Sequence, residues 1–233
     1  QIQISSYGEA FCVAALRLAT YLADSPAAFD VKSENFGKVI RFIRETQISS
    51  IRGNCWDFSV MGRAVSRNGA LHGRLGYLQK IIDYNLDPEN ESIYVDALER
   101  QNENKPADYH VWEFNKHYWA SDYTQQARSE YLFAVRNVSK RTVEAETGNG
   151  ENLKANYFSY GATFMSVDGT EYMNIMPYWD WAMIPGTTFP HITTFPDRPN
   201  WAGNPGNTHF VGGVSDGMHG ASTLNLYEGT TRA

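Results

Sequence analysis

The chain changes character near its middle, and this change limits the folds that it can adopt. Before residue 102, apolar residues recur every three or four positions, as in helices that bury one face. After residue 106, short alternating runs are separated by Gly, Asn and Pro, as in strands. Helices followed by strands predict an α+β chain with two domains, a helical one over 1–103 and an antiparallel β one over 104–233.

Three hydrophobic stripes and one capping motif define the expected helices. The stripes contain Phe11, Ala15, Leu18 and Leu22, then Phe36, Ile40 and Ile43, then Leu71, Leu75, Leu78 and Ile82. A fourth helix is expected from Asp87, because an acid cap there precedes a proline at the first helical position. Alternating side chains over 109–114 and 131–136 predict the first strands.

Composition excludes several classes of protein. With 42% hydrophobic and 20% charged residues among 233, the chain is expected to be folded. Its net charge of -6 argues against a nucleic-acid partner, which favours a basic face. The sequence contains no run of about 18 apolar residues, so no membrane-spanning segment is predicted. Cys12 and Cys55 lack metal-ligand or redox spacing and are expected to be buried free thiols.

The stretch from Arg52 to Arg67 breaks the helical pattern and carries the first candidate site. Arg63 and Arg67 are four residues apart, so a helix or tight turn would point both guanidinium groups the same way. Two such groups suit a carboxylate or a sulfate. The alternative is a surface loop with a charged helix start.

Three other features could contribute to the same chemistry. Tyr7 stands where the first helix starts, and beside one of the arginines its phenolate form would be favoured, as in a general acid or base. The acid- and amide-rich loop Glu144 to Asn152 could orient an arginine or bind sugar hydroxyls. Trp201 in a Pro/Gly/Asn-rich loop is the best candidate for stacking on a sugar. The alternative for Tyr7 is a tyrosine that packs on the core, for the loop a solvated hairpin, and for Trp201 ordinary core packing.

The six histidines form no recognisable metal motif. His110 and His117 are too loosely placed for a triad. His117 lies near Trp119 and Asp122 and could bind a metal, but a histidine on the surface of a sheet is favoured.

Seven motifs together resemble the chondroitin AC lyases of polysaccharide lyase family eight. They are Q-I-Q-I-S-S-Y-G at 1–8, I-R-G at 51–53, G-R-A-V-S-R at 62–67, F-A-V-R-N-V-S-K-R-T at 133–142, E-T-G-N-G-E-N-L at 146–153, Y-M-N-I-M-P-Y-W-D-W at 172–181 and G-G-V-S-D-G-M-H-G-A-S at 212–222. The motifs span the whole chain in the family's order, which makes the resemblance more specific than any one of them.

The resemblance implies the C-terminal part of an α/α toroid followed by the start of a large antiparallel β-sandwich, with the substrate cleft between them. It also implies β-elimination at a uronic acid. A base removes the proton on C5, an acid protonates the leaving O4, and an unsaturated uronate results. The carboxylate of the uronate must be neutralised for this reaction, because the C5 proton is only weakly acidic.

The resemblance assigns six positions. Tyr7 matches the catalytic tyrosine, Arg63 the arginine that holds it, and Glu146 the glutamate that orients this network. The expected substrate-binding residues are Arg67, Asn149 and Trp201.

Two departures from the family pattern stand out. The family's catalytic histidine, in an H-G-P-Q sequence, and its carboxylate-neutralising asparagine belong before residue 1, so the chain is expected to be an internal fragment that could be inactive alone. Of the calcium site near the W-D-W region, Asp180 remains, while Ala182, His191 and Ile192 stand at the other expected positions. A calcium site needs several oxygen ligands, so no metal or other cofactor is expected.

These observations predict a glycosaminoglycan lyase fragment that acts on chondroitin sulfate, with hyaluronan as a second candidate substrate. It is expected to be secreted or periplasmic and monomeric, with no nucleic-acid or membrane partner. One alternative is a hyaluronan or xanthan lyase of the same family. Another is a carbohydrate-binding piece that keeps Trp201 and the arginines but catalyses nothing. A histidine nine residues before Tyr7 would favour the enzyme.

Overall fold

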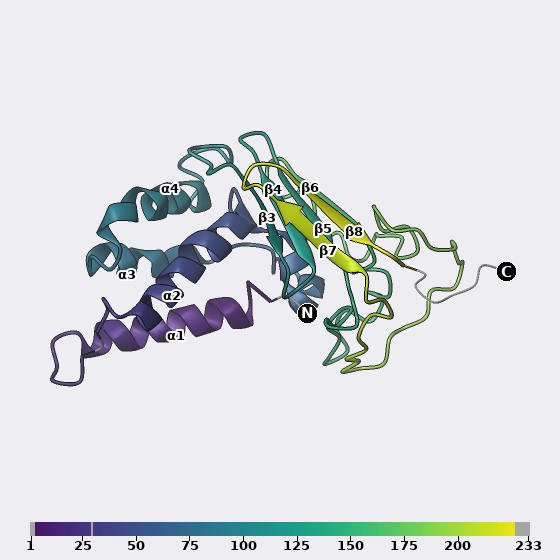
Figure 1. The fold of residues 1–233 in the computed structure, drawn as a ribbon, viewed down its shortest axis with the longest axis horizontal. Helices are drawn as coiled ribbons and strands as arrows, with labels where there is room; N and C mark the ends of the chain where they lie inside the picture. Colours follow the sequence, from purple (N-terminus) through teal and green to yellow (C-terminus); the bar gives the residue numbers. More distant parts are fainter. Residues whose placement is uncertain (1–2, 29, 227–233) are drawn as a thin grey trace.

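A computed structural model of the chain describes residues 3–28 and 30–226, with helices at one end and strands beside them (Figure 1). The α-helices are α1 (Tyr7–Leu22), α2 (Glu34–Phe42), α3 (Leu78–Asp83) and α4 (Glu91–Gln101). Shorter helical turns are the π-helix η1 (Ile43–Gln47) and the 3-10 turns η2 (Ile48–Ser50), η3 (Phe58–Val60), η4 (Gly62–Ser66), η5 (Leu75–Tyr77) and η6 (Pro88–Asn90). The α+β class is therefore confirmed.

The second predicted helix forms, and α1 forms but buries a different face. The third stripe is helical only in part, because Leu71 lies in a turn, Leu75 begins η5 and α3 starts at Leu78. In α2, the Ser33 hydroxyl accepts a hydrogen bond from the backbone of Phe36, and the predicted stripe is buried. In α1, however, Phe11 is 61% exposed and Leu18 49% exposed. The buried face of α1 consists of Cys12, Leu16 and Ala19. The predicted stripe of α1 is therefore wrong, because apolar residues occur on more than one face of this helix.

The predicted fourth helix begins differently from the expected cap. Asp87 precedes η6 with Pro88 at its start, but the aspartate side chain makes no capping hydrogen bond. Its carboxylate instead accepts hydrogen bonds from Arg44 at 2.5 Å and from the Tyr94 hydroxyl at 2.5 Å. An ion pair between elements thus replaces the local cap.

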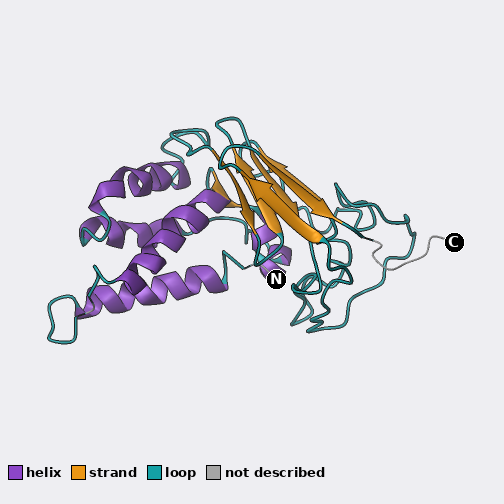
Figure 2. Cartoon of the chain, viewed as in Figure 1, coloured by secondary structure: helices purple, strands orange, loops and turns teal. Residues whose placement is uncertain are grey.

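The strands form a four-stranded antiparallel sheet in the order β3-β4-β5-β6, and two separate hairpins (Figure 2). Their bounds are β1 (Ile51–Arg52), β2 (Cys55–Trp56), β3 (Phe114–Tyr118), β4 (Tyr123–Ala127), β5 (Leu132–Arg136), β6 (Ala162–Ser166), β7 (Val211–Ser215) and β8 (Gly220–Leu224). The strand predicted over 131–136 is confirmed. The one predicted over 109–114 is wrong except at Phe114, because residues 109 and 110 lie in a turn and residues 111–113 have no regular structure.

One hydrophobic core runs from the helices into the sheet. Phe58, on the helical side of the chain, has its ring centroid within 5.3 Å of those of Phe158, Phe164, Tyr172 and Trp179. Trp179, from the Y-M-N-I-M-P-Y-W-D-W motif, thus packs against the core.

Buried Arg52, from the I-R-G motif, joins the same two parts of the chain. Its guanidinium donates hydrogen bonds to the carbonyls of Val167, Arg128 and Ser129. The expected boundary at 103/104 falls between α4 and β3, yet the division into two domains stays a prediction, since core and hydrogen bonds cross it.

Two further observations concern the described residues. Cys12 and Cys55 are buried free thiols, as predicted. Burial raises the pKa of Cys12 to about 12 and that of Cys55 to about 11. No helix in the described ranges is both long enough and apolar enough to span a bilayer.

Candidate functional site

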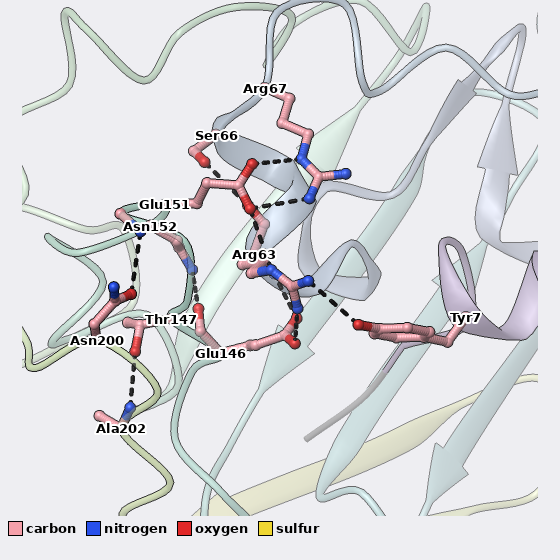
Figure 3. A network of polar contacts seen from close by, with 11 residues as sticks. Tyr7, Arg63, Ser66, Arg67, Glu146, Thr147, Glu151, Asn152, Asn200 and Ala202 are labelled. Atoms are coloured by element: carbon pink, nitrogen blue, oxygen red, sulfur yellow. Dashed lines mark hydrogen bonds and ion pairs between the residues drawn. The ribbon is translucent and has the colours of Figure 1, made fainter.

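Four segments that are far apart in the sequence meet at the beginning of α1 (Figure 3). They are residues 5–7, the turn η4, the loop 144–152 that follows β5, and the loop 199–202. Each supplies side chains to one network of polar contacts.

Tyr7 is the first residue of α1, and its side chain is largely exposed at 56%. The backbone before it is fixed, because the buried hydroxyl of Ser5 donates a hydrogen bond to the carbonyl of Val60 at 3.3 Å. The Tyr7 hydroxyl accepts a hydrogen bond from Nη2 of Arg63 at 3.2 Å. An accessible hydroxyl therefore faces a guanidinium group.

Glu146 holds Arg63 at two points. Its Oε2 accepts a hydrogen bond from the Arg63 backbone at 2.9 Å, and its Oε1 forms an ion pair with Nη1. Gly62 makes this approach possible, because it has a φ of +59° and a Cβ at this position would lie 2.6 Å from Oε2. Both charged side chains are mostly buried, at 11% and 14% exposure. The Arg63 guanidinium is thus fixed relative to Tyr7.

Glu151 connects the two arginines. Its Oε1 accepts a hydrogen bond from Nε of Arg67 at 2.6 Å, and its Oε2 accepts bonds from Nη2 of Arg67 at 2.9 Å and Nε of Arg63 at 3.2 Å. The hydrogen bond and charge of Arg67, followed by those of Arg63, hold the pKa of Glu151 below its ordinary value. The two guanidinium groups therefore do point to one place, as their spacing predicts.

Trp201 lies against the other side of Arg63. The guanidinium carbon is 5.1 Å from the centroid of the indole, within the range of a cation–π contact. The indole packs on Gly148, where a Cβ would lie 2.6 Å from Cζ3 of the ring. At 60% exposure, most of Trp201 stays accessible. Asn149 is exposed next to this contact, with a φ of +55°.

The loops 144–152 and 199–202 are tied together below the indole. The Thr147 hydroxyl donates to the carbonyl of Pro199 at 2.8 Å and accepts from the backbone of Ala202 at 3.0 Å. The backbone of Gly150 donates to the side chain of Asn200 at 3.1 Å. These bonds fix Trp201 relative to the loop that carries both glutamates.

Arg136 supports the site from within the core. Its guanidinium donates to the carbonyl of Ser59 at 2.9 Å and to that of Glu144 at 3.0 Å. Ser59 precedes the turn with Arg63, and Glu144 precedes Glu146 by two residues. Burial lowers the pKa of Arg136 to about 10, although the nearby carboxylate of Asp57 opposes the shift. One buried side chain thus holds together the two segments that form the Arg63–Glu146 pair.

Asp180 and His117, which are candidate metal ligands in the sequence, contact other protein groups. Asp180 accepts a hydrogen bond from the backbone of Ala182 at 3.0 Å and lies 3.2 Å from Nε2 of His191. Nδ1 of His117 lies 2.8 Å from the hydroxyl of Thr124, on neighbouring strands. Among the residues that the structure describes, no three His, Cys, Asp or Glu side chains are grouped so that they could hold a metal ion.

The structure brings the sequence-predicted residues together in one place. Tyr7, Arg63, Arg67 and Glu146 share the network, Trp201 covers Arg63, and Asn149 lies on the adjoining loop. Glu151 is the residue that the sequence did not single out. The sequence feature that could have identified Glu151 is the second glutamate in E-T-G-N-G-E-N, since this acidic loop was expected to orient an arginine.

This arrangement has a defined chemical capacity. It places an exposed hydroxyl beside a fixed cation, a second cation nearby, and an exposed aromatic ring. Such a site can bind an acidic saccharide and transfer a proton at the hydroxyl.

Comparisons with known proteins show the family to which the chain belongs. Residues 1–98 match the family profile described as polysaccharide lyase family 8, N terminal alpha-helical domain, and residues 113–233 match its super-sandwich domain. The chain is 39% identical over 227 residues to a chondroitinase-AC of Pedobacter heparinus, covering 97% of this chain and 32% of that protein. It therefore spans about a third of the length of this relative.

Solved structures show the same fold. A chondroitinase AC lyase studied in complex with oligosaccharides superposes with a TM-score of 0.88 at 38% identity, over 95% of this chain and 33% of that one. The chondroitin AC lyase of Streptomyces coelicolor A3, in complex with chondroitin sulphate, gives 0.76 at 21% identity, over 97% and 36%. A xanthan lyase of Paenibacillus gives 0.75 at 20%, over 96% and 24%.

Proposed function

The chain belongs to polysaccharide lyase family 8, and on that premise we propose that it supplies Tyr7, Arg63 and Glu146 to the catalytic centre of a glycosaminoglycan lyase. The proposed substrate is chondroitin sulfate, with hyaluronan as a second acidic polysaccharide. The observation that carries the proposal is the chain of contacts from Glu146 through Arg63 to the Tyr7 hydroxyl.

In the proposed reaction, a base removes the proton from C5 of the uronate, the C4–O4 bond breaks and a C4–C5 double bond forms. Tyr7 delivers a proton to the departing O4. The guanidinium of Arg63, 3.2 Å from the Tyr7 hydroxyl, stabilises negative charge on both oxygens. Glu146 keeps Arg63 in this position, since it holds the backbone as well as the side chain of the arginine.

The substrate contacts are proposed on the same geometry. Arg67 faces the site with nearly half of its side chain exposed and can pair with an acidic group. The exposed indole of Trp201 offers a stacking surface for a sugar ring, and Asn149 on the neighbouring loop can bond to hydroxyls. These contacts suit an acidic saccharide without selecting chondroitin over hyaluronan or xanthan.

The proposal includes the finer architecture. The helical part is taken as the C-terminal part of an α/α toroid, and the sheet as the start of a large antiparallel sandwich, in a secreted or periplasmic monomer.

The proposed reaction uses no metal or other cofactor. Because Asp180 pairs with His191, added calcium is expected to leave the melting temperature unchanged, and a rise that a chelator reverses would contradict this.

The test is the ultraviolet absorbance of the unsaturated uronate, measured with the chain extended at its N-terminus to include the expected histidine and asparagine. Absorbance is expected to rise with chondroitin sulfate and to stay flat with Tyr7→Phe. Xanthan and hyaluronan are assayed in parallel to assign the substrate. Binding to Trp201 without any rise in absorbance, on all three substrates, would leave a carbohydrate-binding role in place of catalysis.

A further inference from the structure

We infer that Glu151 is an internal counter-ion that the acidic group of a substrate must displace, whereas a neutral saccharide leaves it paired with the arginines. The inference rests on the proposed function and deepens it. It assigns the role of a competitor for the arginines to a residue that touches both of them but lies outside the pair formed by Arg63 and Glu146.

The first argument is the position of the carboxylate. Glu151 is bonded by both oxygens to the fork of Arg67 and by one oxygen to Arg63, at 2.6 to 3.2 Å. This is the geometry in which arginines bind the carboxylate of a uronic acid or a sulfate group. Glu151 therefore occupies the place that the sequence predicts for an acidic group of a ligand.

The second argument is the balance of charge. The site holds two guanidinium groups, Arg63 and Arg67, and two carboxylates, Glu146 and Glu151. With all four in contact the local charges cancel, and the chain as a whole carries a net charge of -6. An acidic polymer gains attraction at this place only when one carboxylate leaves it.

The third argument distinguishes the two carboxylates. Glu146 is bound to the backbone of Arg63 as well as its side chain, and is 14% exposed. Glu151 bonds only through side chains to its arginine partners, and is 23% exposed beside an Arg67 that is 48% exposed. Glu151 can therefore exchange with solvent or ligand by side-chain rotation, while Glu146 cannot leave without freeing a backbone donor.

The backbone beneath Glu151 is held in place during such an exchange. Glu151 and Gly148 are paired across a tight turn, with the Glu151 amide donating to the Gly148 carbonyl at 2.9 Å. Only the flexible side chain has to move. A neutral sugar carries no charge that could replace these ion pairs and therefore leaves Glu151 in place, whereas a carboxylate or sulfate can replace them, so only the charged ligand competes with Glu151.

The experiment measures binding to Glu151→Gln and to the wild type by calorimetry. One ligand is a chondroitin hexasaccharide, and the other is the same hexasaccharide made neutral by reduction of its carboxyl groups and removal of its sulfates. Glu151→Gln is expected to bind the charged sugar about tenfold more tightly and the neutral sugar about equally. Asp197→Asn is the matched control, because it makes the same change in net charge at an exposed acid that pairs with Lys154. Its affinities are expected to change less than twofold.

A second arm separates this inference from the proposed function. Inorganic sulfate is titrated while the Nε–H signals of Arg63 and Arg67 are followed by NMR, and it is expected to shift them at lower concentration in Glu151→Gln than in wild type. If sulfate does so but no saccharide binds, the counter-ion role stands and the proposed substrate class fails. Weaker or unchanged binding of sulfate and of the charged sugar by a folded Glu151→Gln protein would overturn the inference and leave Glu151 as a support for Arg63.

Discussion

Replacing Gly62 with alanine should damage the candidate site more than an ordinary change at a surface turn. Gly62 has a φ of +59°, and a Cβ there would lie 2.6 Å from Oε2 of Glu146. That oxygen accepts the backbone hydrogen bond of Arg63. The methyl group would therefore impose a left-handed conformation on alanine and also push the carboxylate away from its donor.

The magnitude follows from these two effects. A left-handed alanine costs about 1 kcal/mol of folding stability. Loss of a hydrogen bond to a charged group adds roughly 1.5 to 3 kcal/mol. Gly62→Ala is therefore expected to lower the free energy of unfolding by about 3 kcal/mol. Gly69→Ala is the matched control, because Gly69 has a φ of +66° and no atom lies within 4 Å of its would-be Cβ.

The assay is equilibrium unfolding in urea for the wild type and both variants, with the Arg63 amide signal followed by NMR. Gly69→Ala should lose about 1 kcal/mol, so the two variants should differ by about 2 kcal/mol. Only Gly62→Ala should move the Arg63 amide signal. Equal stabilities, with that signal unmoved in both, would refute the assignment of Gly62 as the residue that admits Glu146.

Three further predictions concern the rest of the network. Gly148→Ala should displace Trp201, because its Cβ would lie 2.6 Å from the indole, and should shift the indole N–H signal of Trp201; Gly203→Ala, with open space at its Cβ, should not. An unmoved signal in Gly148→Ala would contradict the packing. Arg136→Met should cost about 3 kcal/mol in urea unfolding, because the carbonyl of Ser59 loses its guanidinium donor and that of Glu144 keeps only the Ser159 hydroxyl; a cost under about 1 kcal/mol would show that Arg136 does not hold the two segments together. Arg67→Gln should raise the pKa of Glu151, read from its carboxyl carbon by NMR. Because the pKa of Glu151 is lowered in the folded state, the stability that this carboxylate contributes is fully present above about pH 4.3, the ordinary pKa of glutamate. It is lost as the pH falls through the lower pKa of the folded state. The Arg67→Gln protein should therefore lose less folding stability on acidification than the wild type. An unchanged pKa would mean that Arg67 is not the main partner of Glu151.

The sequence predicted those features of the fold that arise between neighbours in the chain. The stripe of Phe36, Ile40 and Ile43 marked α2, and alternation over 131–136 marked β5, because periodicity is local. Local patterns failed where a tertiary contact was stronger. Asp87 pairs with Arg44 instead of capping its helix.

The candidate site divides along the same line. The four-residue spacing of Arg63 and Arg67 and the acidic loop after residue 144 were visible in the chain, and the order of the motifs pointed to the family. The spacing also predicted that both guanidinium groups would face one place, which depends only on the local turn, since Arg63 lies in η4 and Arg67 directly follows it.

The tertiary structure alone decided what occupies that place. Glu151 reaches Arg67 from 84 residues away, Glu146 reaches Arg63 from 83 residues away, and Trp201 covers the same guanidinium from a further loop. Contacts over such separations depend on how the core joins the helices to the sheet, and no periodicity in the sequence encodes them. Composition and spacing thus determined which charges are available, and packing decided which of them meet.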